Sequence, residues 1–420
     1  MENKDSRVIF HIDVNSAYLS WEAADRMQHG EEIDLRELPS AVGGDPLSRH
    51  GIILAKSTPA KQYKIKTGES IFVAKQKCPN LVIVPPHYDL YIRCSNAMVQ
   101  VLKDYTPTIQ RFSVDECFLD FTNMEHLYPD YLELAYRIKD RIKGELGFTV
   151  NIGISNNKLL AKVASDLKKP DRVHTLFPSE IKEKMWCLEV GDLFMVGRAT
   201  VPKLNKLNIF TIGDLAQYDL GIIRDRLKSH GVMIWNYANG RESSEVRNTN
   251  YIDMKGIGNS TTMAFDVEDR DTAHKVLLSL CETVGMRLRN SQNCCGLVSV
   301  SIRTSAFMSF SKQKKLDYYT DCTCNIDKSV CDLFDSIWKG EPIRHLGVSV
   351  SDLCTNEFCQ VTLFEDTNIE KNKALDKTVD MIRMKYGSKS IVKATFLHSG
   401  IKPLAGGIGE DSYPIMSSIL

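Results

Sequence analysis

Three carboxylates stand at the ends of apolar segments, where a buried strand would ordinarily end in a neutral turn. Asp13 follows the apolar run 8–12 (VIFHI), and Asp115 and Glu116 separate the apolar runs RFSV and CFLDF. If these segments are neighbouring strands of one sheet, the three carboxylates meet at one edge, where their oxygens would bind a hard cation such as Mg²⁺. Each acid alone could be a turn or capping residue, but the repeated placement favours a metal site.

A second group of polar residues lies in the segment 153–170, GISNNKLLAKVASDLKKP. A strand is predicted to end at Ile154, and Ser155 or Asn156 is expected to cap the helix that follows. Lys169 comes at the end of that helix, where it could interact with the helix dipole or hold a polyphosphate as a point charge. The residues alone leave both roles of Lys169 open.

Composition limits the class of protein. The chain has 420 residues, 43% of them hydrophobic and 25% charged, which predicts a folded protein of two to four domains. The N-terminus lacks the apolar core of a signal peptide, and no segment is apolar enough to span a bilayer, so we expect a cytoplasmic protein without membrane contact. The twelve cysteines are expected to be reduced thiols, because their spacings match neither a disulfide framework nor a zinc site.

Charge is distributed unevenly, although the formal net charge is zero. A zero sum taken alone would argue against a nucleic-acid partner. Basic residues nevertheless dominate two stretches, 55–78 and 286–320, and such patches are the electrostatic footprint of binding to phosphate groups.

Strands and helices alternate through about residue 175, which predicts an α/β or α+β domain that would position the acids. Residues 176–245 predict short helices. From about 250 the order is strand, helix, strand, strand, helix, strand, the split ferredoxin-like order. The predicted ranges there are 259–267, 272–291, 296–305, 314–323, 329–338 and 343–353, followed by a polar tail with one helix at 369–387.

Four segments together resemble the motifs of the Y-family DNA polymerases, the translesion enzymes of the DNA polymerase IV and UmuC-like kind. They are FHIDVNSAYLSWEA, AKSTPAKQYKIKTGE, RFSVDECFLDFT and GISNNKLLAKVASDLKKP. The resemblance covers residues 7–365 and implies an α+β, multidomain right-hand polymerase. Its expected parts are a ferredoxin-like palm (1–22 and 80–175), small fingers (23–79), a helix-hairpin-helix thumb (176–247), a ferredoxin-like, DNA-binding little finger (248–355) and a C-terminal tail (356–420).

The same resemblance implies a template-directed DNA polymerase that adds deoxynucleotides to a primer 3′ end and copies past damaged bases with low fidelity. Asp13, Asp115 and Glu116 would be catalytic and, with the backbone carbonyl of Val14, would hold two Mg²⁺ ions, for which Mn²⁺ can substitute. Tyr18 would be a steric gate that excludes a 2′-hydroxyl. The nucleotide would further contact Asn15, Ser16, Ala17, Thr58, Lys61 and Lys169.

Several positions depart from the family pattern. Thr58 and Lys61 stand where many relatives have Tyr and Arg, and Asn15 stands where many have a second Asp. Met195 replaces the usual first glycine of the thumb hairpin, while Gly197 is retained.

The implied partners are primer-template DNA, deoxynucleoside triphosphates and the replication sliding clamp, with the protein acting as a monomer. The basic stretch from Arg287 to Lys315 would lie along the duplex. In the tail, the segment 360–364 (QVTLF) resembles the bacterial clamp-binding pentapeptide, so Gln360, Leu363 and Phe364 are expected to bind the clamp.

Two other functions have to be weighed. Another palm-type nucleotidyltransferase, such as a nucleotide cyclase, also sets carboxylates on a ferredoxin-like sheet, but it has no use for a thumb hairpin or a second basic domain. A catalytically silent, polymerase-derived DNA-damage scaffold should have lost metal ligands, whereas Asp13, Asp115 and Glu116 are all present. We therefore expect an active polymerase.

Overall fold

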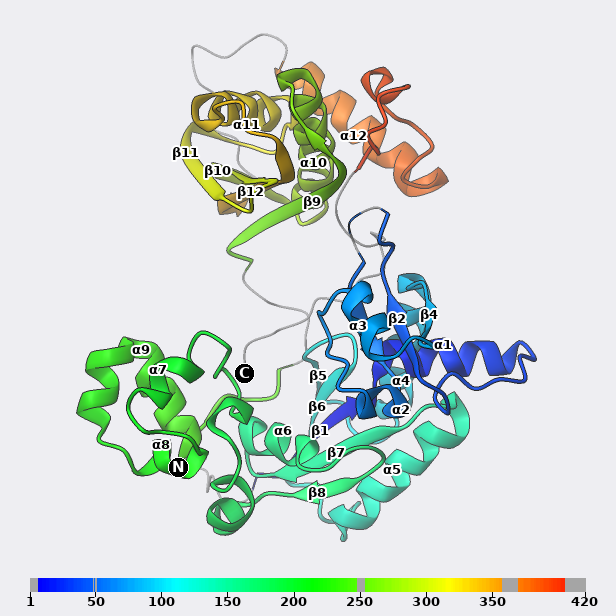
Figure 1. Ribbon diagram of the computed structural model, residues 1–420, viewed down its shortest axis with the longest axis vertical. Helices are drawn as coiled ribbons and strands as arrows, with labels where there is room; N and C mark the ends of the chain where they lie inside the picture. Colours follow the sequence, from blue (N-terminus) through cyan, green and yellow to red (C-terminus); the bar gives the residue numbers. More distant parts are fainter. Residues whose placement is uncertain (1–6, 48, 50, 248–253, 357–368, 405–420) are drawn as a thin grey trace. The chain divides into compact units, whose positions relative to one another are not determined.

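The computed structural model describes residues 7–47, 49, 51–247, 254–356 and 369–404. The chain divides into two compact units (Figure 1). The first is built mainly from residues 7–43 and 53–247, and the second mainly from residues 254–404.

A five-stranded sheet forms the centre of the first unit, as expected of the palm. Its order is β5-β6-β1-β7-β8, and β1 lies antiparallel to both β6 and β7. This register places Asp13 of β1 opposite Glu116 of β6 and Asn151 of β7. The strands are β1 (Ile9–Val14), β5 (Ile109–Arg111), β6 (Glu116–Asp120), β7 (Val150–Ser155) and β8 (Val173–Thr175).

Helices cover both faces of this sheet, which explains why its central strands are so apolar. Alternate residues of β1, such as Phe10 and Ile12, pack with α1 (Ala17–Gln28), α4 (Tyr88–Leu102) and α5 (Tyr131–Leu146). The other face, which carries His11 and Asp13, lies against α6 (Lys158–Asp166).

The approach of α6 to β7 is close. A Cβ added to Gly153 would lie 2.0 Å from the carbonyl oxygen of Ala161, so only glycine fits there. Asn157 caps α6 by accepting a hydrogen bond from the backbone N–H of Leu160. The cap predicted at Ser155 or Asn156 is therefore wrong, because Ser155 is the last residue of β7 and its hydroxyl donates to the carbonyl of Leu176.

A smaller three-stranded sheet, order β3-β2-β4, forms the expected fingers. It contains β2 (Ser40–Gly43), β3 (Ile53–Lys56) and β4 (Val82–Val84), with α2 (Thr58–Gln62) and α3 (Ile71–Lys77) beside it. Because β4 is parallel to β2, this sheet reaches beyond residue 79, the expected end of the fingers.

Helices make up most of residues 178–238, and all but the last are short, as the sequence predicts for the thumb; α9 (Leu220–Ala238) has 19 residues. They are η2 (Pro178–Glu180), η3 (Ile181–Met185), η4 (Val190–Asp192), α7 (Val201–Asn205), α8 (Ile212–Gln217) and α9 (Leu220–Ala238). Met195 lies between them with φ 70°, a left-handed conformation that favours glycine.

The second unit confirms the predicted split order of strands and helices. Its sheet, β11-β10-β12-β9, is antiparallel throughout, and α10 and α11 contribute to the same buried core. Each strand–helix–strand pair is split by a strand of the other pair. The elements are β9 (Gly256–Val267), α10 (Arg270–Asn290), β10 (Asn293–Thr304), β11 (Ser309–Thr320), α11 (Thr323–Ile337) and β12 (Ile343–Thr355).

The tail helix α12 (Ile369–Tyr386) and the turn η5 (Ala394–Phe396) belong to this second unit. Arg289 of α10 forms ion pairs with Asp376 and Asp380 of α12. The expectation that the whole basic stretch lies along the duplex is therefore wrong for Arg289, whose charge is used inside the protein.

The predicted clamp motif, 360–364, lies outside the described residues. No described helix is both long and apolar enough to cross a membrane.

Candidate active site

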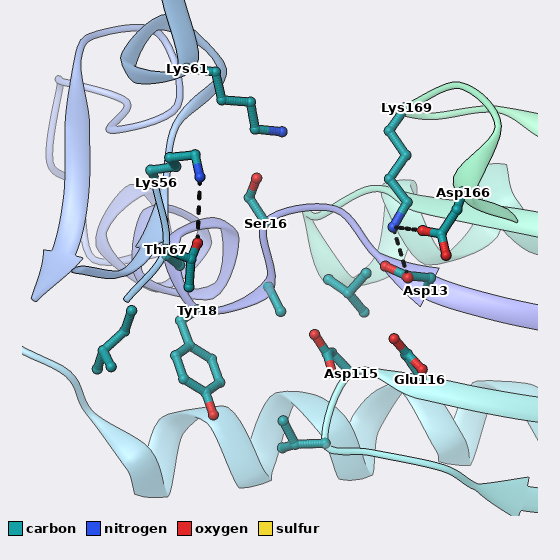
Figure 2. Close-up of a pocket in the computed structure, with 15 residues that line it drawn as sticks. Asp13, Ser16, Tyr18, Lys56, Lys61, Thr67, Asp115, Glu116, Asp166 and Lys169 are labelled. Atoms are coloured by element: carbon teal, nitrogen blue, oxygen red, sulfur yellow. Dashed lines mark hydrogen bonds and ion pairs between the residues drawn. The ribbon is translucent and has the colours of Figure 1, made fainter. Parts of the chain in front are cut away.

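An open cleft of about 560 Å³ lies between the palm sheet and the fingers, and the three predicted acids line it together (Figure 2). Asp13 comes from β1, Asp115 from the end of the β5–β6 connection, and Glu116 from the first position of β6. The remaining lining residues are Val14, Ser16, Ala17, Tyr18, Leu54, Ala55, Lys56, Lys61, Thr67, Val114, Asp166 and Lys169.

Asp13 is the most deeply buried of the three acids, and it forms an ion pair with a lysine. Lys169 Nζ lies 2.8 Å from Asp13 Oδ2 and 2.8 Å from Asp166 Oδ1 (Figure 2). Burial raises the pKa of Asp13 to about 7, although the charge of Lys169 opposes this shift. Burial alone would lower the pKa of Lys169, but Asp13 and Asp166 raise it overall. The carboxyl of Asp13 therefore lacks sufficient positive charge around it.

Glu116 lies in a different electrostatic environment. Lys162 Nζ of α6 donates to Glu116 Oε2 over 2.6 Å, and the buried ring of His11 approaches the same oxygen to 3.4 Å. Burial would raise the pKa of Glu116, but His11 and Lys162 outweigh it and lower the pKa to about 2. Glu116 is therefore ionised throughout the physiological range.

The carboxylate of Asp115 is bound by a hydroxyl rather than by a lysine. Ser113 Oγ donates to Asp115 Oδ1 over 2.5 Å, and Asp115 makes no ion pair with the described residues. Its pKa is raised, mainly by burial and further by the charge of Glu116. A cation in the cleft would remove this penalty.

The donor set suits a divalent cation that arrives with a polyphosphate. Among the described residues, no three His, Cys, Asp or Glu side chains are arranged to hold a metal ion, and Lys169 and Lys162 bind oxygens of Asp13 and Glu116. Mg²⁺ is commonly held by one or two carboxylates together with substrate phosphates. The residues thus fit Mg²⁺, provided that Lys169 releases Asp13.

Tyr18 forms a rigid wall of the cleft. Its ring stacks on Tyr91 with centroids 4.2 Å apart and an interplanar angle of 11°. Tyr91 is in turn fixed by its hydroxyl, which donates to Glu22 over 2.6 Å. Because its support is buried and hydrogen-bonded, the Tyr18 ring cannot easily move away from a substituent that would clash with it.

The side of the cleft opposite the acids offers donors for phosphate. Ser16 and Ala17 line it at the start of α1, where helix N–H groups lack partners within the helix. Lys61 of α2 also lines it, and its pKa is lowered by burial and then by the charge of Lys169. Thr58 is exposed and is not among the lining residues.

The sequence interpretation missed Lys56 and Thr67, which line the cleft on the fingers side. Lys56 Nζ donates to Thr67 Oγ1 over 3.4 Å (Figure 2). The alternation of β3 could have revealed Lys56, because Ile53 and Ala55 are buried while Leu54 and Lys56 are half-buried, and Lys56 lines the cleft.

Val14 and Asn15 differ in where they lie. Val14 lines the cleft, and its N–H donates to the carbonyl of Asp115 over 3.1 Å. Asn15 is not a lining residue. Its N–H donates to the carbonyl of Thr149 over 3.0 Å, so this amide is not available to a phosphate.

Comparisons with known proteins agree with this arrangement. Residues 12–166 match the impB/mucB/samB family, and residues 254–363 match the C-terminal domain of that family. The chain is 50% identical to DNA polymerase IV of Clostridium acetobutylicum over 393 residues, which span 93% of this chain and 98% of that relative. It is 35% identical to DNA polymerase IV 2 of Bacillus subtilis over 398 residues, 93% of this chain and 95% of the relative.

Solved structures show the same fold. A chimera of the Y-family DNA polymerases Dbh and Dpo4 superposes with a TM-score of 0.70 at 22% identity, covering 83% of this chain and 100% of the chimera. A ternary complex of Dbh superposes with a TM-score of 0.57, also at 22% identity, over 82% of this chain and 98% of Dbh.

Proposed function

The chain belongs to the Y family of DNA polymerases, and from this premise we propose how its cleft performs template-directed, translesion DNA synthesis. One observation supports the assignment of the cleft above all others. Asp13 and the adjacent pair Asp115 and Glu116, about 100 residues apart in sequence, line one cleft whose opposite side carries lysines and a helix N-terminus. A phosphoryl-transfer site needs these two sides facing each other, because the reacting group is a polyanion.

The same placement argues against the silent scaffold, since all three acids face the cleft. A nucleotide cyclase is not supported, because the relatives are DNA polymerases that match nearly the whole chain.

We propose that Asp13, Asp115, Glu116 and the carbonyl of Val14 hold two Mg²⁺ ions, with Mn²⁺ as a substitute. Such ions, when bound, would activate the primer 3′-oxygen and stabilise the pyrophosphate leaving group. Lys162 stays with Glu116 and orients its carboxylate. Lys169, whose Nζ lies 2.8 Å from Asp13 Oδ2, would leave Asp13 and contact the triphosphate.

Nucleotide contacts follow from the lining of the cleft. Ser16 and Ala17 would donate backbone N–H groups to the triphosphate, and Lys61 would supply a further positive charge. Asn15 would contribute indirectly, by stabilising the turn between β1 and α1 that carries Ser16 and Ala17. Thr58 lies one turn before Lys61 on α2 but does not line the cleft. A contact between Thr58 and the nucleotide would therefore require α2 to move toward the cleft.

Tyr18 is proposed as the steric gate. A 2′-hydroxyl of an incoming ribonucleotide would meet the face of this stacked ring, which has no space behind it because Tyr91 lies 4.2 Å away. Discrimination by exclusion requires such a rigid wall.

Primer-template DNA is the proposed macromolecular partner. Backbone N–H groups of the thumb hairpin near Gly197 and exposed lysines of β11, such as Lys314, would contact phosphates. The protein would act as a monomer that the sliding clamp tethers through Gln360, Leu363 and Phe364. A clamp raises the effective concentration of polymerase at the primer end without any new contact in the cleft.

Primer extension tests the proposed activity directly. The purified full-length chain is given a defined primer-template, four deoxynucleotides and Mg²⁺, and the same reaction is run with EDTA and with Asp115→Ala. We expect template-directed extension in the reaction with the unchanged protein and Mg²⁺, and in neither of the other two. Extension by Asp115→Ala at the unchanged rate would show that the cleft is not the active site.

The clamp proposal has its own test. Leu363→Ala with Phe364→Ala should abolish binding to the sliding clamp and stimulation by it, while clamp-free extension stays unchanged. Wild-type clamp affinity in the double variant would exclude the motif.

A further inference from the structure

Two buried asparagines lie side by side behind the cleft, and the chemistry above makes no use of their side chains. Asn15 directly follows β1, and Asn151 is on the neighbouring strand β7; their exposed fractions are 7% and 0%. Asn15 Nδ2 donates to Asn151 Oδ1 over 3.1 Å. Burying two amides is unfavourable unless their polar atoms find partners, so the identity of those partners indicates what the pair does.

The orientation of Asn151 is fixed by two backbone carbonyls. Its Nδ2 donates to the carbonyl oxygen of Ser165 over 2.9 Å and to that of Lys168 over 2.8 Å. Because a carbonyl oxygen only accepts, the nitrogen of Asn151 must face this side. Its Oδ1 therefore faces Asn15 and also accepts from the backbone N–H of Arg172 over 3.2 Å.

The orientation of Asn15 follows from that of Asn151. Its nitrogen must face Asn151 Oδ1, so its own Oδ1 faces the opposite way. There it accepts from Thr149 Oγ1 over 2.9 Å and from the backbone N–H of Asp171 over 2.9 Å. The two amides thus form one directed chain of hydrogen bonds from the palm sheet to the segment 168–172.

The pair holds that segment on both sides of Lys169. Lys168 is held through its carbonyl, and Asp171 and Arg172 are held through their N–H groups. From the backbone between these points, the Lys169 side chain extends to Asp13, with Nζ and Oδ2 2.8 Å apart (Figure 2). The side chain of Asp171 is bound separately, by Lys139 and Lys143.

We propose that Asn15 and Asn151 are positioning residues for Lys169, acting on its backbone and thereby on the place of its ammonium group in the cleft. This inference rests on the proposed function, in which Lys169 leaves Asp13 for the triphosphate. A lysine side chain is long and flexible, so its charge is placed accurately only if its backbone is fixed. A displacement of about 1 Å at such a group can reduce the rate about 100-fold.

Asn15→Asp is the sharpest variant, because it keeps the shape of the side chain and replaces the donor by an acceptor. The new oxygen would face Asn151 Oδ1, and two acceptors repel each other. Single-nucleotide incorporation by the full-length protein is measured as kcat/KM for the nucleotide, both in the unchanged chain and in Lys169→Ala. A residue that acts only through Lys169 loses its influence when Lys169 is removed.

We expect Asn15→Asp to lower kcat/KM about 10-fold in the unchanged chain and less than about twofold in the Lys169→Ala background, since groups that act as a unit are not additive. An equal loss in both backgrounds, or no loss in either, would overturn the proposal. Melting temperature and primer-template affinity show whether each variant is folded.

Thr149→Val is the milder variant if Asn15→Asp does not fold. It removes one bond, from Thr149 Oγ1 to Asn15 Oδ1, and is expected to lower kcat/KM about threefold in the unchanged chain only. Equal losses in the two backgrounds would again overturn the proposal.

Asn239→Asp is the matched control. Asn239 Nδ2 also donates to two backbone carbonyls, those of Ala216 and Trp235, but in the thumb. This variant should lower the melting temperature and leave kcat/KM within about twofold of the unchanged chain. Asp115→Ala separates the proposed active site from the positioning inference. If Asp115→Ala is inactive, the cleft assignment stands. If the Asn15→Asp losses are nevertheless equal in both backgrounds, only the positioning inference fails.

Discussion

The palm cleft and the helical layer of the second unit both bury carboxylates against basic side chains, yet they do so in opposite ways. In the cleft, the charged partners of the predicted acids are lysines, each of which makes a single contact with one of them: Lys169 with Asp13 and Lys162 with Glu116. In the second unit the partners are the arginines Arg289 and Arg383.

Arg289 is satisfied on every side. Its Nε and Nη2 donate to the two carboxylate oxygens of Asp380, over 2.5 and 3.1 Å, and its Nη1 donates to Asp376, to the carbonyl of Asp321 and to the hydroxyl of Thr323. Such a forked arrangement is rigid, and its charge cannot be removed without leaving a buried carboxylate unpaired.

The carboxylates of the cleft are less completely paired than those around Arg289. Asp115 has a hydroxyl as its partner, and the pKa of Asp13 is raised to about 7 by burial even with Lys169 beside it. A lysine is a point charge on a flexible chain, so it can be exchanged for a cation. The difference indicates that arginine forks fix α12 permanently, whereas lysines hold the cleft in a state from which a substrate can displace them.

The largest effect should come from Asp115→Asn, which tests the cleft side of the comparison. Losing a metal ligand should reduce nucleotide incorporation at least about 10³-fold. The melting temperature should stay the same or rise, because burial already disfavours the ionised form of Asp115. Rapid-quench incorporation assays and thermal melts measure the two quantities. A large fall in melting temperature would show that the Asp115 carboxylate stabilises the fold, contrary to the comparison.

Asp380→Asn should have the opposite outcome. Removing one charge leaves Arg289 partly unpaired in a buried site, which costs about 3–5 kcal/mol. We expect hydrogen exchange of α12 to increase strongly, while kcat for clamp-free incorporation stays within about twofold. Protection of α12 equal to that in the unchanged protein would mean that the arginine fork does not fix this helix.

Tyr18→Ala tests whether the cleft excludes as well as binds. We expect ribonucleotide incorporation to increase about 100-fold relative to deoxynucleotide incorporation, because the ring acts by occupying the space of a 2′-hydroxyl. The ratio of kcat/KM values for dCTP and rCTP measures this. Tyr91→Phe keeps the ring under Tyr18 and removes its bond to Glu22, so it should change the ratio far less than Tyr18→Ala, which removes the excluding ring itself. An unchanged ratio in Tyr18→Ala would assign that ring to the core alone.

The sequence predicted the acids of the cleft because their signal is local. An apolar run that ends in an acid is visible within ten residues, and strand pairing then brings Asp13 and Glu116 into register. The signals of α5 are equally local, because Asp130 caps its start and Gly147 ends it with φ 74°.

Contacts between distant polar residues could not be predicted in this way. Lys162 is on the helix α6, whereas its partner Glu116 is on the strand β6, and no periodicity of the sequence links the two positions. The pairing of Arg289 with Asp380 likewise joins residues 91 positions apart. In both cases the partners became visible only with the fold, because ion pairing depends on three-dimensional proximity rather than on a repeating pattern.

The smallest effect concerns the pH dependence of stability, and it tests whether Asp13 is unsatisfied. Since its pKa is about 7 in the folded chain against an ordinary value of 3.8, the folded state binds a proton between these values that the unfolded state has released. The free energy of unfolding should therefore fall as the pH rises through this window and level off above about pH 7. Glu116, whose pKa is lowered to about 2, has the opposite sign, and its contribution is lost only as the pH falls below about 4.5.

Thermal melts of the unchanged chain and of Asp13→Asn, recorded in EDTA from pH 6 to pH 8, isolate the contribution of Asp13. The lowered pKa of His11 affects both proteins, so the difference between them removes most of its influence. We expect the unchanged chain to lose about 1 kcal/mol relative to Asp13→Asn over this range, which corresponds to about 2–4 °C in melting temperature. Parallel curves would mean that Lys169 satisfies Asp13 as fully as Arg289 satisfies Asp380, and the contrast between the two regions would then disappear.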